Sequence, residues 1–270
     1  EYFIAKRIID SKAYKSSISA PIIKIGIVAI AIGIIVMMVA IATGIGLQQK
    51  IRDKVVAFNG HASIAKYDTN NSQESQTPIS INQDFYPEFT SVEGIKHIQA
   101  VASKSAIIRK EFDFEYIIVK GVGADYNWEY FQEYLIEGVL PDYTKTRNEE
   151  VLISEYLSKR LQIAVGDKIN TFFIKSDINK SPSIISYKVV GVYNSGFKDF
   201  DELYIIGDIR HIRRLNKWKK DEIGNFEVFI DDYDKLDEKG IEIFKNIPSV
   251  LNSVTVTDKY YLVFEWIGIF

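Results

Sequence analysis

A long stretch without a charged side chain constrains the fold of this chain more than any other feature. Residues 25–47 read IGIVAIAIGIIVMMVAIATGIGL, and Thr43 is the only polar side chain among these 23 residues. As a helix rising about 1.5 Å per residue, the stretch would be roughly 34 Å long, enough to cross a hydrocarbon core about 30 Å thick. A helix also satisfies every backbone N–H and C=O internally, as lipid requires. We therefore predict a membrane span.

Two other interpretations of the same stretch are a buried core helix and the apolar part of a signal peptide. The apolar region of a signal peptide is shorter, about 7–15 residues, and a small-residue cleavage site follows it. Here the run is longer, and Lys50, Arg52 and Lys54 come after it. These features favour a true span.

The charges that flank the span predict its orientation. Basic residues outnumber acidic ones before it: Lys6, Arg7, Lys12, Lys15 and Lys24 against Glu1 and Asp10. By the positive-inside rule, the N-terminus is expected in the cytoplasm and the long remainder of the chain on the other side. The basic residues just after the span reduce this asymmetry, but long translocated segments respond little to such charges.

The composition excludes several classes of protein. The 270 residues carry a net charge of −3 and no cysteine. A near-neutral chain without a basic, aromatic-rich stripe is not expected to bind nucleic acid. Without cysteine, neither a disulfide framework nor a thiolate metal site is possible.

The order of patterns predicts four segments. Residues 1–20 form a cytoplasmic amphipathic helix, because apolar residues recur at helical spacing in YFIAKRII. Residues 21–58 form transmembrane helix 1 and its extracytoplasmic extension, which the Asn59-Gly60 pair ends. Residues 59–257 form a periplasmic α+β domain of two subdomains, because short strands and helices follow in irregular order. Residues 258–270, with the aromatic run YYLVFEWIGIF, begin a second transmembrane helix at which the chain is cut; a C-terminal core helix is the alternative.

Within the α+β domain, clear strands are expected at residues 98–109 and 112–122. Glu111, just before the second of them, and Asp113 and Glu115 within it alternate with aromatic residues. Such a row of carboxylates could serve acid–base chemistry or hold a cation, but a solvated strand face is the commoner explanation. Residues 68–80 are expected to form a polar loop without core-forming residues, and residues 125–135 a helix.

Two further helices are expected to begin at side-chain caps. Ser154 would cap residues 154–161, and Asp208 would cap residues 208–215. A polar, hairpin-like loop at residues 175–186 separates two expected strands. The remaining expected elements are strands at 150–153, 168–174, 187–193, 203–206, 226–230 and 253–256, and a helix at 232–244.

No catalytic motif is present. The closest glycine pairs, Gly44-Ile-Gly46 and Gly121-Val-Gly123, have neither the third glycine nor the lysine of a phosphate-binding loop. His61, His97 and His211 lack the spacing of metal ligands and are expected to be structural or exposed. No G-x-S-x-G nucleophile elbow occurs. We therefore predict a non-catalytic protein with no metal and no cofactor of its own.

Several short motifs occur in a recognisable order. They are Phe3-Ile-Ala-Lys-Arg7, Glu150-Val-Leu-Ile-Ser154, Leu161-Gln-Ile-Ala-Val-Gly-Asp167, Val189-Val-Gly-Val-Tyr193 with Gly196 and Asp201, and Phe264-Glu-Trp266. With the basic N-terminus, the span and the long outer domain, this order resembles the permeases of MacB/FtsX/LolC-type ABC transporters. The nearest likeness is to the lipoprotein-releasing LolC/LolE permeases, and it covers nearly the whole chain.

The resemblance implies a multi-pass permease of the inner membrane with its large domain in the periplasm. It implies a separate cytoplasmic ABC ATPase, which binds ATP and Mg, and a second permease subunit, identical or paralogous. It further implies an acylated lipoprotein substrate, taken from the outer leaflet of the membrane lipid and passed to a periplasmic carrier.

The same resemblance suggests two contact regions. Substrate contact is expected on the outer part of the span, where acyl chains gain about 0.8 kcal/mol per buried CH₂ and methionines adapt to varied shapes; the residues are Met37, Met38, Ile41, Ile45 and Leu47. Plain packing against lipid explains them as well. The loop at 175–186 is the candidate for carrier docking, through Lys175, Asp177, Asn179, Lys180 and Pro182; an ordinary hairpin tip is the alternative.

Two other functions remain open. One is a MacB-like efflux or FtsX-like signalling permease. The other, from a different class, is a sensor or binding module anchored by a single span.

Overall fold

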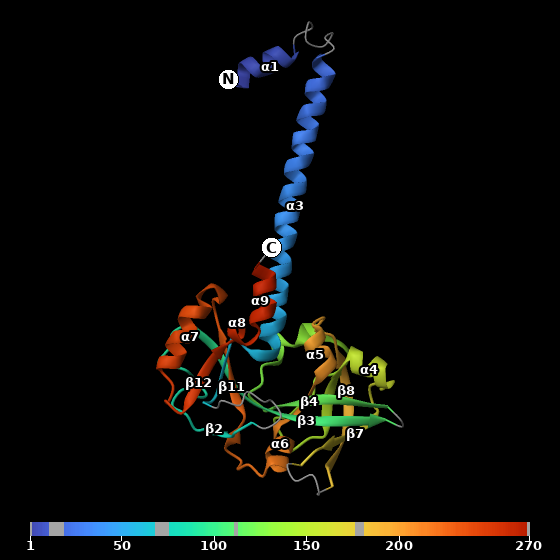
Figure 1. The fold of residues 1–270 in the computed structure, drawn as a ribbon, viewed down its shortest axis with the longest axis vertical. Helices are drawn as coiled ribbons and strands as arrows, with labels where there is room; N and C mark the ends of the chain where they lie inside the picture. The colour runs from blue at the N-terminus through green and yellow to red at the C-terminus, as the bar shows by residue number, and fades with distance from the viewer. Residues whose placement is uncertain (1, 11–18, 68–75, 111–112, 176–180, 269–270) are drawn as a thin grey trace. The chain divides into compact units, whose positions relative to one another are not determined.

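The computed structural model describes residues 2–10, 19–67, 76–110, 113–175 and 181–268. The chain forms two compact units, one of residues 1–51 with 266–270 and one of residues 52–265. Each unit is described by itself. Figure 1 shows the order of their elements along the chain.

The first unit holds the apolar part of the longest helix, whose last residues, 52–59, belong to the second unit. A short helix, α1 (Tyr2–Asp10), is followed by α3 (Ser19–Asn59), one uninterrupted helix of 41 residues. Pro21 lies in the first turn of α3, where a missing backbone N–H breaks no helical hydrogen bond. Among the described residues, the part Pro21–Asn59 is the one helix long and apolar enough to cross a membrane, and its most apolar window is 0% buried. The last helix, α9 (Tyr261–Gly268), is also apolar.

The second unit is built on a ten-stranded mixed sheet. Its order is β12-β1-β11-β3-β4-β9-β6-β8-β5, with β7 pairing both β3 and β8. The strands are β1 (Ala62–Lys66), β3 (Ile95–Lys110), β4 (Asp113–Val122), β5 (Leu135–Gly138), β6 (Glu150–Ser154), β7 (Lys168–Phe173), β8 (Ser183–Tyr193), β9 (Tyr204–Asp208), β11 (Asn225–Ile230) and β12 (Leu251–Thr255). A separate pair joins β2 (Ile79–Ser80) to β10 (Glu222–Ile223).

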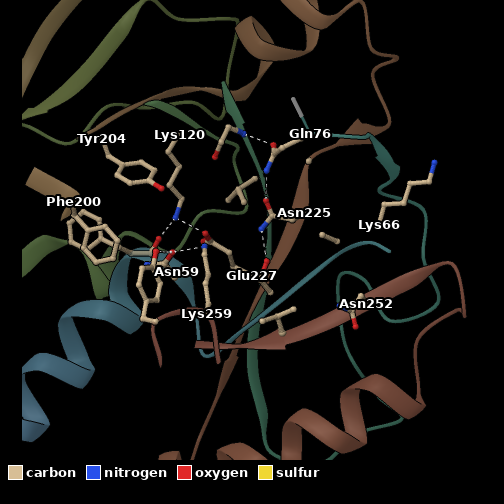
Figure 2. A pocket seen from close by; sticks show the side chains of 18 of the residues that line it. Asn59, Lys66, Gln76, Lys120, Phe200, Tyr204, Asn225, Glu227, Asn252 and Lys259 are labelled. Carbon is tan, nitrogen blue, oxygen red and sulfur yellow. Dashed lines mark hydrogen bonds and ion pairs between the residues drawn. The ribbon is translucent and has the colours of Figure 1, made fainter. Parts of the chain in front are cut away.

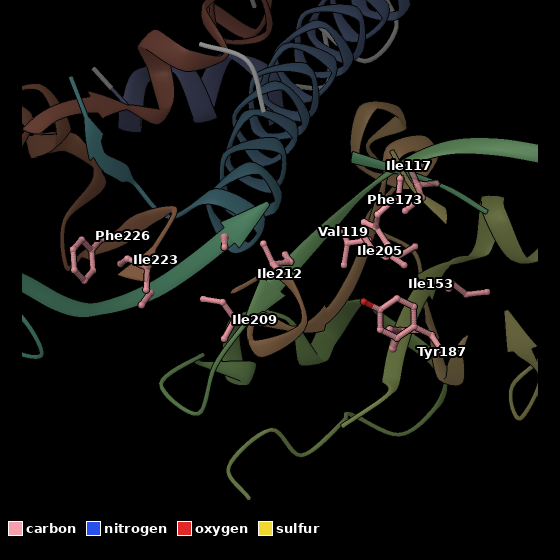
Figure 3. Packing of buried hydrophobic residues seen from close by; sticks show 14 of the residues in the cluster. Ile117, Val119, Ile153, Phe173, Tyr187, Ile205, Ile209, Ile212, Ile223 and Phe226 are labelled. Carbon is pink, nitrogen blue, oxygen red and sulfur yellow. The ribbon is translucent and has the colours of Figure 1, made fainter. Parts of the chain in front are cut away.

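Six of these strands close into a ring. The pairings run from β3 through β4, β9, β6, β8 and β7 and return to β3. Alternate residues point inward and are buried, as a small barrel filled by side chains requires; they include Ile117, Val119, Ile153, Phe173, Tyr187 and Ile205 (Figure 3). The ring therefore has its own apolar core.

The other strands form a second lobe beside the ring. β12, β1 and β11 extend the sheet from the first half of β3, and the helix α7 (Leu236–Lys245) lies with them (Figure 1). One face of this part packs against aromatic residues: the rings of Phe226 and Phe85 lie 5.2 Å apart, and those of Phe226 and Tyr86 5.1 Å apart. The long strand β3 thus joins two lobes within one α+β unit.

The capped helices form as expected. The Ser154 hydroxyl accepts from Leu157 N at 3.1 Å and begins α4 (Glu155–Leu161). The Asp208 carboxylate accepts from Arg210 N at 2.9 Å and begins α6 (Ile209–Asn216). Asn59 ends α3, and Gly60 follows it with a φ of +70°.

Three expectations about local structure were wrong. Residues 125–135 form two 3₁₀ turns, η1 (Trp128–Tyr130) and η2 (Gln132–Tyr134), because β5 begins at Leu135 and pairs with β8. The stretch 68–80, expected to lack core-forming residues, contains Ile79, which is buried at 6% exposed, while residues 68–75 lie outside the described part of the chain. The strand β8 already begins at Ser183, which shortens the loop before it.

Three further helical elements belong to the second unit. The helix α5 (Lys198–Leu203) was not expected from the sequence. The preceding loop is held to it by Asp201 of α5, which accepts hydrogen bonds from Ser195 N at 3.0 Å and Gly196 N at 3.1 Å. The remaining elements are η3 (Tyr233–Lys235), capped by Asp232, and α8 (Val256–Lys259), capped by Thr255.

Candidate functional site

The end of α3 is buried in the second unit through an aromatic cluster. Phe58 is 4% exposed, and its ring stacks on that of Phe200 at 5.0 Å and 9°. The rings of Phe131, Tyr134 and Tyr193 lie 5.0, 5.8 and 5.5 Å from it. Burying a side chain of this size stabilises the fold by about 2–3 kcal/mol, and tilted or stacked ring pairs add to this. The last turn of α3 is therefore held firmly by the domain.

Asn59 connects the end of α3 to the residues just before α9. Its Nδ2 donates to Val55 O at 3.1 Å, which caps the helix. Its Oδ1 accepts from Lys259 Nζ at 3.0 Å and from Tyr260 OH at 2.8 Å. One amide thus joins segments that lie 200 and 201 residues apart in sequence.

A buried ion pair joins the two lobes at the same place. Lys120 of β4 and Glu227 of β11 approach to 2.7 Å, with side chains 5% and 6% exposed. Lys120 Nζ also donates to Phe58 O, the carbonyl at the end of α3, and Glu227 Oε2 accepts from Gln99 Nε2 at 2.9 Å. A cation at a helix C-terminus is stabilised by the helix dipole. We call Asn59, Lys120, Glu227, Lys259 and Tyr260 the polar junction (Figure 2).

Burial changes the acid–base behaviour of the junction. Burial lowers the pKa of Lys259 to about 8; nearby Glu227 opposes this shift, and Lys120 adds to it. Burial also raises the pKa of the Tyr260 hydroxyl, with the charge of Glu227 acting in the same direction. The Lys259 side chain keeps accessible surface and lines a cavity.

The cavity lies beside the polar junction and measures about 530 Å³. Its floor is one face of the sheet, crossing β12, β1, β11, β3 and β4, and the end of α3 and residues 258–260, at the end of α8, contribute to its wall. Figure 2 labels lining side chains from β1, β4, β11, β12 and the end of α3, together with Lys259 of α8. The polar lining residues are Asn59, Ser63, Lys66, Gln76, Thr77, Ser103, Lys120, Tyr204, Asn225, Glu227, Asn252, Asp258, Lys259 and Tyr260. A space of this size accommodates a small molecule.

The structure places the expected substrate-contact residues together on α3, in the first unit. Met37, Met38, Ile41, Ile45 and Leu47 are 64%, 65%, 56%, 59% and 51% exposed. Their role in substrate contact stays a prediction. In the candidate docking loop, Lys175 and Pro182 are exposed, whereas Asp177, Asn179 and Lys180 lie outside the described residues. Its role in carrier docking also stays a prediction.

The three histidines form hydrogen bonds with the backbone. His61 Nδ1 accepts from Ile230 N at 3.2 Å, and the Nε2 atoms of His97 and His211 lie 2.9 Å from Asp125 O and Asn148 O. Among the described residues, no group of His, Asp and Glu side chains could hold a metal ion.

The carboxylate row on β4 is covered by an arginine rather than fully solvated. Arg160 of α4 pairs with Glu115 at 2.9 Å and with Asp113 at 3.6 Å. The Glu115 side chain is only 22% exposed, whereas Phe114 and Tyr116 are 69% and 43% exposed. The expected solvated face is therefore wrong for Glu115, and Glu111 lies outside the described residues.

Sequence reasoning missed the polar junction. One signal was present: Lys120 interrupts the apolar run IIVKGV. In a strand buried on both faces, a lysine needs a partner for its charge. The partner, Glu227, is 107 residues away, and nothing local in the sequence points to it.

A family model decides what kind of domain this is. The model of the MacB-like periplasmic core domain matches residues 25–238, more than half of the chain. The chain belongs to this family. Its MacB-like domain is the periplasmic domain of an ABC-type transporter permease, and its α+β fold agrees with the expectation from the sequence.

Solved structures of related domains are similar to the MacB-like domain at low sequence identity. The periplasmic region of MacB from Actinobacillus actinomycetemcomitans is 16% identical over 75% of this chain and 91% of that one, with a TM-score of 0.47. The extracellular domain of the ABC-type transporter YknZ from Gram-positive bacteria is 15% identical over 61% and 83%, with a TM-score of 0.40. None of the curated proteins gives a significant match.

Proposed function

We propose that this chain is the permease subunit of an ABC transporter that extracts acylated lipoproteins from the outer leaflet of the inner membrane. A separate cytoplasmic ATPase powers it, and a periplasmic carrier accepts the lipoprotein. The observation that carries the proposal is the continuity of α3: one helix contains the uncharged stretch 25–47 and ends inside the MacB-like core at Asn59.

The polar junction supports a mechanical role for this helix. Phe58 is enclosed by aromatic rings, and Phe58 O accepts from the buried Lys120. The end of α3 therefore cannot shift without moving the strands that carry these groups, because a packed interior transmits displacement. In this proposal, closure of the ATPase moves the membrane helices, and the junction passes that movement to the periplasmic domain.

The exposed apolar side chains of α3 support a lipid-modified substrate. Met37 and Met38 are unbranched and flexible, so they accommodate acyl chains of different lengths. The proposed assembly has a second permease subunit, identical or paralogous, and each permease crosses the inner membrane several times with its N-terminus in the cytoplasm.

Depletion of the protein in its own cells tests the proposal. Lipoproteins bound for the outer membrane should accumulate in the inner membrane, and the wild-type chain should restore their release. A photo-reactive residue at Met38 should cross-link to the retained lipoproteins, whereas one at Ile22, near the other end of α3, should not. A change in drug or toxin export with normal lipoprotein release would contradict the proposal and favour an efflux permease.

The cavity favours a second candidate, a ligand-binding module anchored in the membrane. A pocket of about 530 Å³ in an outer domain suits a sensor as well as a permease. Purification of the full-length protein in mild detergent separates the two. A permease should retain an ABC ATPase through affinity and size-exclusion steps, whereas an anchored sensor should elute without one.

A further inference from the structure

The cavity wall contains hydrogen-bond donors that the described residues do not satisfy. An ammonium group has three N–H donors, and Lys259 uses one of them on Asn59 Oδ1. The Asn252 side-chain amide, on the strand β12, has no hydrogen-bond partner among the described residues. Both side chains keep accessible surface, so their remaining donors are available to water or to a ligand in the cavity.

Among the described residues, no carboxylate forms an ion pair with Lys259. The nearby Glu227 is shared with other donors, since its Oε1 accepts from Lys120 and its Oε2 from Gln99. Asp258 is exposed, and its Oδ2 accepts from Thr255 Oγ1 at 2.7 Å. The lining as a whole holds three lysines against two carboxylates, so the cavity carries a net positive charge.

The floor of the cavity is a fixed row of amides and hydroxyls. Asn225 Nδ2 donates to Ser63 Oγ at 3.0 Å, and Gln76 Nε2 donates to Asn225 Oδ1 at 3.3 Å. Gln76 Oε1 in turn accepts from Ser103 N at 2.7 Å. Figure 2 shows this row next to the Lys120–Glu227 pair. Side chains held in such a chain are pre-organised, and a bound molecule loses little free energy in ordering them.

We propose that this cavity binds a small organic anion, with a phosphate or carboxylate group paired to Lys259 and hydroxyl groups on the amide row. Phosphate and carboxylate both match a lysine ammonium through charge-assisted hydrogen bonds. The apolar part of the wall, from Phe58, Val101 and Val254, suits the carbon skeleton of such a molecule. The site goes beyond the transport role proposed above and does not depend on it.

The first test is ligand-dependent stability of the full-length protein in detergent. Glycerol 3-phosphate, inorganic phosphate and acetate are added separately in the millimolar range, with sodium chloride at matched ionic strength as the reference. Stabilisation by glycerol 3-phosphate beyond the chloride reference supports the site. Phosphate or acetate acting alone then shows which anionic group Lys259 recognises. Equal melting temperatures in all four solutions would overturn the proposal.

The second test uses the amine of Lys259 directly. Because its pKa is lowered to about 8, Lys259 should react with an amine-specific acylating reagent near neutral pH faster than ordinary lysines do. The anion that stabilises the protein should slow acylation of Lys259 while leaving Lys245, an exposed lysine outside the cavity, unchanged. Equal rates at Lys259 with and without the anion would contradict the assignment.

Two variants complete the test. Lys259→Met should weaken anion binding by about tenfold or more, because a charged hydrogen bond is lost, whereas Lys245→Met should bind as the wild type does. If Lys259→Met bound the anion with unchanged affinity, the proposal would fail. The protection measurement on the wild-type protein gives an answer even where the variant folds poorly.

Discussion

At the scale of single residues, the Lys120–Glu227 pair has the largest expected effect on stability. Both side chains are almost fully buried, so removing one leaves the other charged and unpaired. Lys120→Met should lower the free energy of unfolding by about 3–5 kcal/mol, measured by denaturant unfolding of the full chain in detergent. Lys159→Met, which removes an exposed partner of Glu155, is the matched control and should cost less than about 1 kcal/mol. Similar losses in both variants would show that Glu227 finds another partner.

His61 gives the protein a predictable response to acid. Burial, assisted by the charge of Lys96, lowers its pKa from 6.5 to about 4. Between these values the unfolded chain binds a proton at this position and the folded chain does not, so stability falls as the pH drops through the window. The melting temperature should therefore decrease less between about pH 7 and about pH 4.5 in His61→Asn than in the wild type, and the difference should correspond to about 1–3 kcal/mol. Parallel pH profiles would contradict this prediction.

At the scale of elements, Asn59 should control the stability of the last two helices. Asn59→Ala removes the shared acceptor of Lys259 and Tyr260, so amide hydrogen exchange in α8 and α9 should become faster. Asn246→Ala is a close control, because Asn246 Nδ2 also caps a helix through the carbonyl four residues earlier, Glu242 O, and among the described residues its side chain has no hydrogen bond to α8 or α9. Unchanged exchange in α8 and α9 of Asn59→Ala would show that packing alone holds these helices.

The sequence predicted most elements of this domain, because their signals are local. Ser154 and Asp208 mark helix starts through side-chain oxygens, and Asn59-Gly60 marks a helix end through a left-handed glycine. The failures have non-local causes. Residues 125–135 do not form the expected helix because β5 pairs with β8. Lys120 pairs with Glu227, which lies on a strand far away in the sequence. The candidate site therefore depended on tertiary contacts that no short pattern contains.

At the scale of the whole molecule, the absence of cysteine makes the topology directly testable. Lys6→Cys and Lys245→Cys each introduce a single thiol at an exposed position. In spheroplasts, a membrane-impermeant maleimide should label the thiol at residue 245 at once and the thiol at residue 6 only after lysis, if the N-terminus is cytoplasmic. The wild-type chain, having no thiol, is the blank. Labelling at residue 6 in unlysed spheroplasts would reverse the proposed orientation.

The hydrogen bonds of Asn59 have a consequence for how such a domain can be exchanged during evolution. The domain follows Asn59 and ends at Lys259 and Tyr260, which both donate to the Asn59 side chain. About 200 residues are therefore placed between two positions that lie close together. A domain whose two ends lie close together can be inserted into another protein with little disturbance of that protein's own packing. A permease could therefore exchange this outer module for another of different specificity and leave its membrane helices in register.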